Sequence, residues 1–193
     1  LAHGIFQVKS AFSNSEDSDF ILQMGLWLLI ANIANIAWVW FWLNEITWFT
    51  VPLMLTILCS LLTVVVKLNM QKQPASTAVK RWVWFPISLY SGWITVATIA
   101  NVTTLLVDLG WNGFGVEPEI WTIIVIVVGA LIGSRVVQDR KDFAYGLVIV
   151  WAYYGIISKR MTINADLYQN IIYTAIAGIV LVIFTMIMRL VRK

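Results

Sequence analysis

The sequence predicts an all-α fold, a polytopic transmembrane helical bundle with about six spans. Of the 193 residues, 60% are hydrophobic and 12% are charged, whereas about 25% of an ordinary soluble domain is charged. The mean hydropathy is +0.83. Apolar windows of roughly 20 residues recur along the chain, and such windows are long enough to cross a bilayer as helices. We therefore expect a multi-pass integral membrane protein.

The apolar windows place the expected helices in order. They cover residues 20–43, 45–67, 83–107, 119–137, 142–158 and 168–190. No Gly-Pro linker, low-complexity tract or fixed-period repeat divides the chain, so residues 1–193 are predicted to form a single transmembrane domain. Residues 1–8, LAHGIFQV, are typical of the last turns of an apolar segment, and we expect an N-terminal helix to be missing from the sequence.

The distribution of Lys and Arg predicts the orientation, because positively charged loops stay in the cytoplasm. Eleven of the thirteen basic residues fall on one predicted side, and Lys159 and Arg160 fall on the other. The loop 108–118 carries Asp108 and Glu117 but no cation, which fits the outer side. Both ends of the six-helix array, and so the C-terminus, are predicted to be cytoplasmic. The cations are spread over loop ends, so nucleic-acid binding is not expected.

Soluble-type catalysis is not expected, and no catalytic or metal-ligating residue is proposed. The chain has one Cys, Cys59, and one His, His3, which cannot form a Cys/His metal cluster or an internal disulfide. A haem or chlorophyll ligand at His3 is a minor alternative. No Walker loop or dinucleotide fingerprint is present. Each Asp, Glu, Lys and Arg lies within a few residues of a predicted span end, which disfavours an ion-coupled transporter.

The first and third expected helices carry aromatic and amide groups. In the third helix, one face at helical spacing holds Pro86, Tyr90, Trp93, Ala97, Asn101 and Thr104. In the first helix, Ala31, Asn35, Trp38 and Trp42 repeat the pattern of an amide followed by aromatics. Such groups are costly in lipid unless they are partnered, so the two faces are predicted to wall one cavity. The alternative is that Tyr90 and Asn101 only hydrogen-bond neighbouring helices.

A second face of the third helix carries small and hydroxyl residues, namely Ser88, Ser91, Thr95, Thr98 and Val102. We predict that this face is a helix-packing surface rather than a ligand-binding one. The GxxxG pair Gly129–Gly133 of the fourth helix is predicted to serve packing within the chain rather than a dimer seam. Most of the eleven Trp residues are expected to belong to the aromatic belt at the membrane–water interface. Five Trp residues fit the belt by position: Trp48, Trp82, Trp84, Trp111 and Trp121. Trp93 lies near the centre of its span and does not fit it.

At these residues the sequence resembles a known family. YSGWITVATIAN, residues 90–101, is similar to the Y-x-x-W-x-x-x-A-x-x-x-N core of the fifth helix in the TspO/translocator proteins, the tryptophan-rich sensory proteins. NIAWVWFW, residues 35–42, resembles their third helix. The longer bacterial branch is similar from Pro86 to Asn101, and again at Trp121–Thr122 and VIVWA. By this resemblance, residues 1–107 correspond to the end of the second helix through the fifth, and residues 108–193 form a C-terminal extension with three helices.

The resemblance implies an aromatic-lined pocket inside the bundle for flat hydrophobic ligands, porphyrins and other tetrapyrroles above all, and sterol-like molecules in some members. Carried over by position, the pocket would be lined by Tyr90, Trp93, Ala97, Asn101, Asn35 and Trp38. The protein would act as a sensor or carrier and not as an enzyme. No cofactor is certain, and a tetrapyrrole is the candidate ligand.

Two alternatives from other classes stay open. The chain could be a structural subunit whose Trp-rich faces dock in a larger membrane complex and contact its pigments. It could also be a facilitator for a neutral solute, for which a continuous polar stripe would be expected. The expected partners are the lipid bilayer, a hydrophobic small molecule, and either a second copy in a homodimer or a membrane complex.

Overall fold

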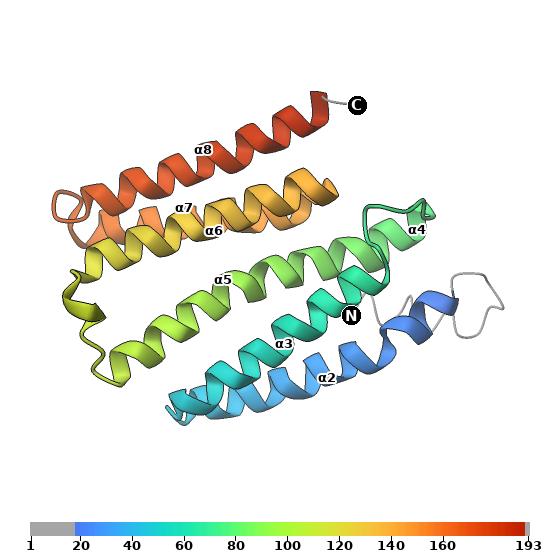
Figure 1. The fold of residues 1–193 in the computed structure, drawn as a ribbon, viewed down its shortest axis with the longest axis horizontal. Coiled ribbons are helices and arrows are strands. Elements are labelled where there is room, and N and C mark those ends of the chain that lie inside the picture. Colours follow the sequence, from blue (N-terminus) through green and yellow to red (C-terminus); the bar gives the residue numbers. More distant parts are fainter. Residues whose placement is uncertain (1–17, 192–193) are drawn as a thin grey trace. The chain divides into compact units, whose positions relative to one another are not determined.

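The structure, a computed structural model, describes residues 18–191, with side chains from residue 24 onward. Within this range the secondary structure is helical throughout, which confirms the all-α prediction. The elements are α2 (Ser18–Leu43), α3 (Thr47–Lys67), α4 (Thr77–Val79), the π-helix η1 (Lys80–Trp84), α5 (Phe85–Asp108), the 3₁₀ turn η2 (Gly113–Gly115), α6 (Pro118–Arg140), α7 (Phe143–Asn164) and α8 (Gln169–Val191), as Figure 1 shows.

Five described helical segments are long and apolar enough to cross a membrane. They are Met24–Leu43, Thr47–Lys67, Thr77–Asp108, Pro118–Arg140 and Gln169–Val191. The predicted span 142–158 corresponds to the helix α7, which is not among these five; its apolar stretch ends at Lys159 and Arg160. The predicted start of the third helix at residue 83 was too late. Helical backbone begins at Thr77, because Lys80 and Arg81 end the apolar window without ending the helix.

The chain divides into two compact units, residues 1–105 and 106–193. In the first unit, α2 and α3 form an antiparallel hairpin closed by a tight turn at Asn44 and Glu45 (Figure 1). The Ile46 N–H donates to the Phe41 carbonyl at 3.0 Å, and the Asn44 side chain donates to the Trp40 carbonyl at 2.8 Å. These bonds satisfy carbonyls that the end of α2 would otherwise leave unpaired.

The α2–α3 hairpin packs with α5 through two buried apolar clusters. The first, here called the Ala31 cluster, comprises Ala31, Ala34, Met54, Ile57, Leu61 and Ile94. The second, here called the Met24 cluster, comprises Met24, Val64, Val65, Leu68, Met70, Val79, Val83, Trp84 and Ile87. Both clusters take side chains from all three long helices of the unit, so together they fix how α5 lies against the hairpin.

Trp84 is not part of an interfacial belt, and that prediction was wrong for this residue. Its side chain is 1% exposed and lies in the Met24 cluster, whereas Trp82 is 37% exposed. Both residues lie in η1, where the Phe85 N–H donates to the Lys80 carbonyl five residues earlier. Residues two positions apart in a helix point to roughly opposite sides. Trp84 shares its side of the helix with Ile87, which lies in the same cluster.

In the second unit, α6, α7 and α8 pack together as a helical bundle. Asp142, between α6 and α7, accepts a hydrogen bond from the Tyr145 N–H at 3.1 Å and so caps α7. The Asn170 side chain donates to Glu119 at 3.0 Å, which joins the start of α8 to the start of α6. Because α6 and α8 begin at the same end, α7 must return along their full length.

Glycines on α6 and α8 form a slot for one aromatic side chain of α7. A Cβ atom at Gly129 would lie 2.5 Å from the Tyr153 hydroxyl, and one at Gly178 would lie 2.6 Å from the Tyr153 ring. The Tyr153 hydroxyl donates to the Ile126 carbonyl on α6. A Cβ at Gly133 would likewise meet Ile149 of α7 at 3.0 Å. The predicted packing role of the Gly129–Gly133 pair is confirmed within the chain.

Candidate ligand-binding site

Three of the six predicted site residues lie against the Ala31 cluster of the first unit. Trp38 reaches the cluster from α2, and Tyr90 and Ala97 reach it from α5. All three are half-buried. Tyr90 and Ala97 are seven residues apart on α5, which is about two helical turns, so they share one side of the helix. The structure therefore brings the predicted faces of the first and third expected helices onto one apolar centre.

Asn101 continues this side of α5 by one turn and meets a polar residue of α3. Its side chain is 3% exposed, and its Oδ1 lies 2.9 Å from the Thr50 hydroxyl, which is also buried. The same hydroxyl lies 2.6 Å from the Thr47 carbonyl. A hydroxyl has one proton to donate, so it can donate to only one of these two oxygens. A flipped amide would satisfy both contacts, with Nδ2 donating to Thr50.

In either orientation, one polar atom of the Asn101 amide is buried without a partner among the described residues. In the orientation of the structure this atom is Nδ2. Leaving a buried polar group without a hydrogen bond costs about 1–3 kcal/mol. This atom lies in the same three-helix unit as the Ala31 cluster, and a ligand that supplied a hydrogen bond here would recover that cost.

Trp38 presents a second buried donor without a partner in the described part of the chain. Its Nε1 is buried and makes no hydrogen bond there. Its ring stacks on the ring of Trp42, one turn further along α2, with centroids 5.5 Å apart and planes 22° from parallel. The pair therefore combines flat apolar faces with an unused N–H group. Such a combination suits a planar ligand that carries acceptor atoms.

The structure does not gather the other two predicted residues as closely. Trp93 is 46% exposed, and Asn35 is half-buried. Trp93 directly precedes Ile94, which lies in the Ala31 cluster, and neighbouring helical residues point about 100° apart. The predicted face of the third expected helix covers a broad arc of α5. The part of that arc that packs against the Ala31 cluster is the side of Ile94 and Ala97. Trp93 consequently lies at its outer edge.

The second face of α5 is buried at four of its five residues, Ser88, Ser91, Thr95 and Thr98. The Thr95 hydroxyl donates to the Ser91 carbonyl at 2.9 Å, and the Thr98 hydroxyl donates to the Ile94 carbonyl at 2.7 Å. These bonds stay within the helix, as is common for Ser and Thr in membrane helices. The Ser91 hydroxyl is buried without a hydrogen-bond partner among the described residues. Burial of the face, with the two Thr hydroxyls bonded inside the helix, fits the packing role predicted for it.

Thr50 is a polar residue of the candidate site that the sequence reasoning missed. It begins a stripe of buried residues on α3 that continues through Met54, Ile57, Leu61 and Val64 at helical spacing. A hydroxyl in line with such a stripe indicates a buried polar contact, and this signal could have found it. Its partner was not visible, because Asn101 lies 51 residues away along the chain.

Within residues 18–191, no group of three or more His, Cys, Asp or Glu side chains is placed to hold a metal ion. His3 lies outside the described residues. In the second unit, a small cavity of about 60 Å³ is lined by Gln138, Thr185, Met188 and Arg189. It shares no residue with the candidate site, and it has room for a few water molecules but not for a tetrapyrrole.

The fold and the candidate site define a class of protein: a multi-pass helical integral membrane protein with aromatic and amide groups gathered between its helices. A comparison with known families narrows this class to one family. The family model described as TSPO-like protein matches residues 1–188, so the chain belongs to the TSPO-like family. This confirms the resemblance seen in the Trp-containing motifs. No curated protein and no solved structure matches the chain significantly.

The family match extends over both the predicted core, residues 1–107, and the predicted extension, residues 108–193. The division of the chain into these two parts stays a prediction.

Proposed function

We propose that this protein binds a flat hydrophobic ligand of the tetrapyrrole or sterol class at the Ala31 cluster, and that it acts as a sensor or carrier. The ligand would contact six residues: Tyr90, Trp93, Ala97, Asn101, Asn35 and Trp38. The observation that carries the proposal is that Asn101 and Trp38, two of the six site residues, each have a buried polar atom without a partner among the described residues, in one three-helix unit.

The chemistry of these side chains fits recognition better than reaction. Indole faces hold a planar ring by stacking, and a few placed hydrogen bonds fix its orientation in a mostly apolar site. The six residues supply aromatic rings, a phenol and two amides, but no carboxylate or imidazole for acid–base catalysis. Binding without catalysis is therefore the activity that we propose.

The test is a titration of the purified, detergent-solubilised protein with protoporphyrin IX, a planar macrocycle with two carboxylates. Binding is followed by the porphyrin absorbance band and by quenching of Trp fluorescence. Asn101→Leu removes the amide, and Trp38→Phe removes the indole N–H but keeps an aromatic ring. Losing one buried hydrogen bond to a charged group costs about 1.5–3 kcal/mol, so each variant should bind about tenfold or more weakly.

Trp40→Phe is the matched control, because Trp40 lies on the same helix two residues away and is 56% exposed. It should bind like the wild type. Circular dichroism checks that each variant is folded. Trp93→Ala tests the outer edge of the site and should weaken binding less than Trp38→Phe does. Equal affinity of Asn101→Leu, Trp38→Phe and wild type would overturn the proposal.

The structural-subunit function is the second candidate, and the exposure of Trp residues favours it. Trp93 and Trp151 are exposed although they lie well inside their helices, and Trp40 is exposed in the last turn of α2. Indole rings on an outer face can contact lipid, pigment or another protein. If porphyrin binding is absent while Trp93→Ala or Trp40→Phe prevents co-purification of other membrane subunits, this function replaces ligand binding.

A further inference from the structure

Four exposed cations gather around one end of the first unit. Lys67 ends α3, Lys72 lies in the following loop, and Lys80 and Arg81 begin η1. We call these four residues the basic cap. Each lies within two residues of a buried member of the Met24 cluster, so the cluster holds them around one helix end.

Among the described side chains of the first unit, no acidic residue balances the basic cap. Residues 46–107 contain no Asp or Glu, and no carboxylate of the described residues forms an ion pair with any of the four cations. Lys80 and Arg81 also lie in the first turns of a long helix, where the helix dipole disfavours positive charge. Within the described part of the unit the four cations thus have no acidic partner, and an anion outside the chain could supply one.

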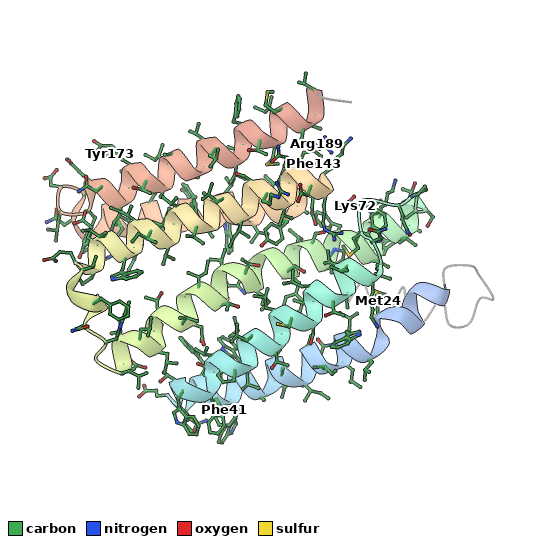
Figure 2. All side chains as sticks on the ribbon, in the orientation of Figure 1. Met24, Phe41, Lys72, Phe143, Tyr173 and Arg189 are labelled. Atoms are coloured by element: carbon green, nitrogen blue, oxygen red, sulfur yellow. The ribbon has the colours of Figure 1, made fainter. Side chains whose placement is uncertain are left out.

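The loop that carries the cap is fixed by its own packing. Leu68 and Met70 are buried, and Asn69 and Gln71 adopt positive φ angles of 46° and 63° that turn the backbone between them. Ser76 then caps the next helix by accepting from the Val79 N–H at 3.2 Å. Figure 2 shows Lys72 on this loop, at the same end of the unit as Met24. The backbone positions that carry the cations are therefore fixed before any ligand arrives.

Aromatic rings set the depth of the cap relative to a bilayer. The Lys67 ammonium lies 5.5 Å from the centre of the Trp27 ring, and the Arg81 guanidinium lies 5.4 Å from the centre of the Trp82 ring. Trp82 and, one turn further on, Phe85 are exposed. Trp rings favour the headgroup level of a membrane. A cation paired with such a ring is consequently held at the level of lipid phosphates.

We propose that the basic cap binds the phosphate groups of anionic phospholipids in the leaflet at this end of the first unit. Clusters of four or more Lys and Arg beside a transmembrane helix attract anionic lipids by about 1 kcal/mol per cation. The exposed rings of Trp82 and Phe85 lie where the acyl chains of such a lipid would run. A phospholipid fits this arrangement better than a free phosphate, which would leave these apolar faces unused.

The experiment compares two Lys-Arg pairs of this chain. Lys80→Gln with Arg81→Gln removes half of the basic cap. Lys159→Gln with Arg160→Gln is the matched control, because it removes the same charge and Arg160 also lies over a ring, that of Tyr168, at 4.5 Å. The full chain in a neutral detergent is titrated with phosphatidylglycerol or phosphatidylcholine. Native mass spectrometry counts bound lipids, and thermal unfolding measures stabilisation.

We expect phosphatidylglycerol to bind the wild type and the control variant and to raise their unfolding temperatures, with phosphatidylcholine much weaker. The Lys80/Arg81 variant should lose about tenfold or more in phosphatidylglycerol affinity. Equal loss in both variants, or no preference for phosphatidylglycerol, would overturn the proposal. Inorganic phosphate at the same concentrations should have no effect; if it reproduces the stabilisation, the ligand is a free phosphate and the lipid assignment is wrong. The proposal does not depend on porphyrin binding.

Discussion

At the scale of single residues, the Thr50–Asn101 contact is the clearest feature of the described core. Both side chains are buried, and their polar atoms lie 2.9 Å apart between α3 and α5. In lipid or in a protein interior, neither group can form a hydrogen bond with water instead. Hydrogen bonds between membrane helices nevertheless contribute modestly, on average about 0.6 and at most about 1.7 kcal/mol. The contact is thus a device that sets helix register more than a large source of stability.

We predict that Thr50→Val destabilises the fold by about 0.6–1.7 kcal/mol, because it keeps the side-chain shape and strands the amide of Asn101. A double-mutant cycle with Asn101→Leu, measured by unfolding in a denaturing detergent, isolates the pair. The loss caused by Thr50→Val should shrink once Asn101 has been replaced. Fully additive effects would show that the two side chains do not interact.

At the scale of elements, close helix approach in the second unit depends on two glycines. Gly129 on α6 and Gly178 on α8 flank the Tyr153 side chain of α7 from two sides. Small residues allow such approach in membrane bundles, where dispersion contacts and buried hydrogen bonds replace the hydrophobic effect. The hydroxyl bond from Tyr153 to Ile126 holds the ring in place, so the ring cannot swing away from an added methyl group.

Gly178→Ala should therefore destabilise the protein by about 1–3 kcal/mol through overpacking. Gly155→Ala is the control within the same bundle, because a Cβ at Gly155 meets nothing within 4 Å. That change should leave stability unaltered or raise it by up to about 1 kcal/mol, since Ala favours a helix more than Gly does. Thermal unfolding in detergent compares the stability of the two variants. Equal unfolding temperatures would contradict the close packing of Tyr153 against Gly178.

At the scale of the whole molecule, the described Lys and Arg residues gather mainly at one helix end of each unit. In the first unit the four cations of the basic cap lie at one end and Glu45 lies in the turn at the other. In the second unit Arg140 and Arg189 lie in the last turns of α6 and α8, and Glu119 lies in the first turn of α6. Positively charged ends stay in the cytoplasm, so we predict a cytoplasmic C-terminus.

Cysteine labelling in intact cells tests this topology. With Cys59, the only cysteine, replaced by Ser, single cysteines are introduced at Lys72, Asn112, Lys141 and Asp166. A maleimide that cannot cross membranes should label the Asn112 and Asp166 positions from outside, and the Lys72 and Lys141 positions only after permeabilisation. Labelling of the Lys141 and Asp166 positions from one side would show that α7 does not cross the membrane.

The sequence by itself determined that the chain is helical, where its helices lie, and its family. Five of the six expected spans correspond to helices with the length and composition to cross a bilayer. These properties are local, because a window of about 20 apolar residues and the charges beside it can be read without knowing any neighbour. The motif from Tyr90 to Asn101 is also contiguous, so it could be recognised directly.

Only the tertiary structure decided which side of each helix faces inward and which polar groups meet. Packing in the Met24 cluster buried Trp84, and the position of Ile94 in its cluster left Trp93 at the outer edge. Thr50 was found only through Asn101, 51 residues away. The physical reason is that a helix face is defined relative to its partners. Periodicity gives the relative angles of side chains around one helix, whereas packing against other helices sets the rotation of that helix.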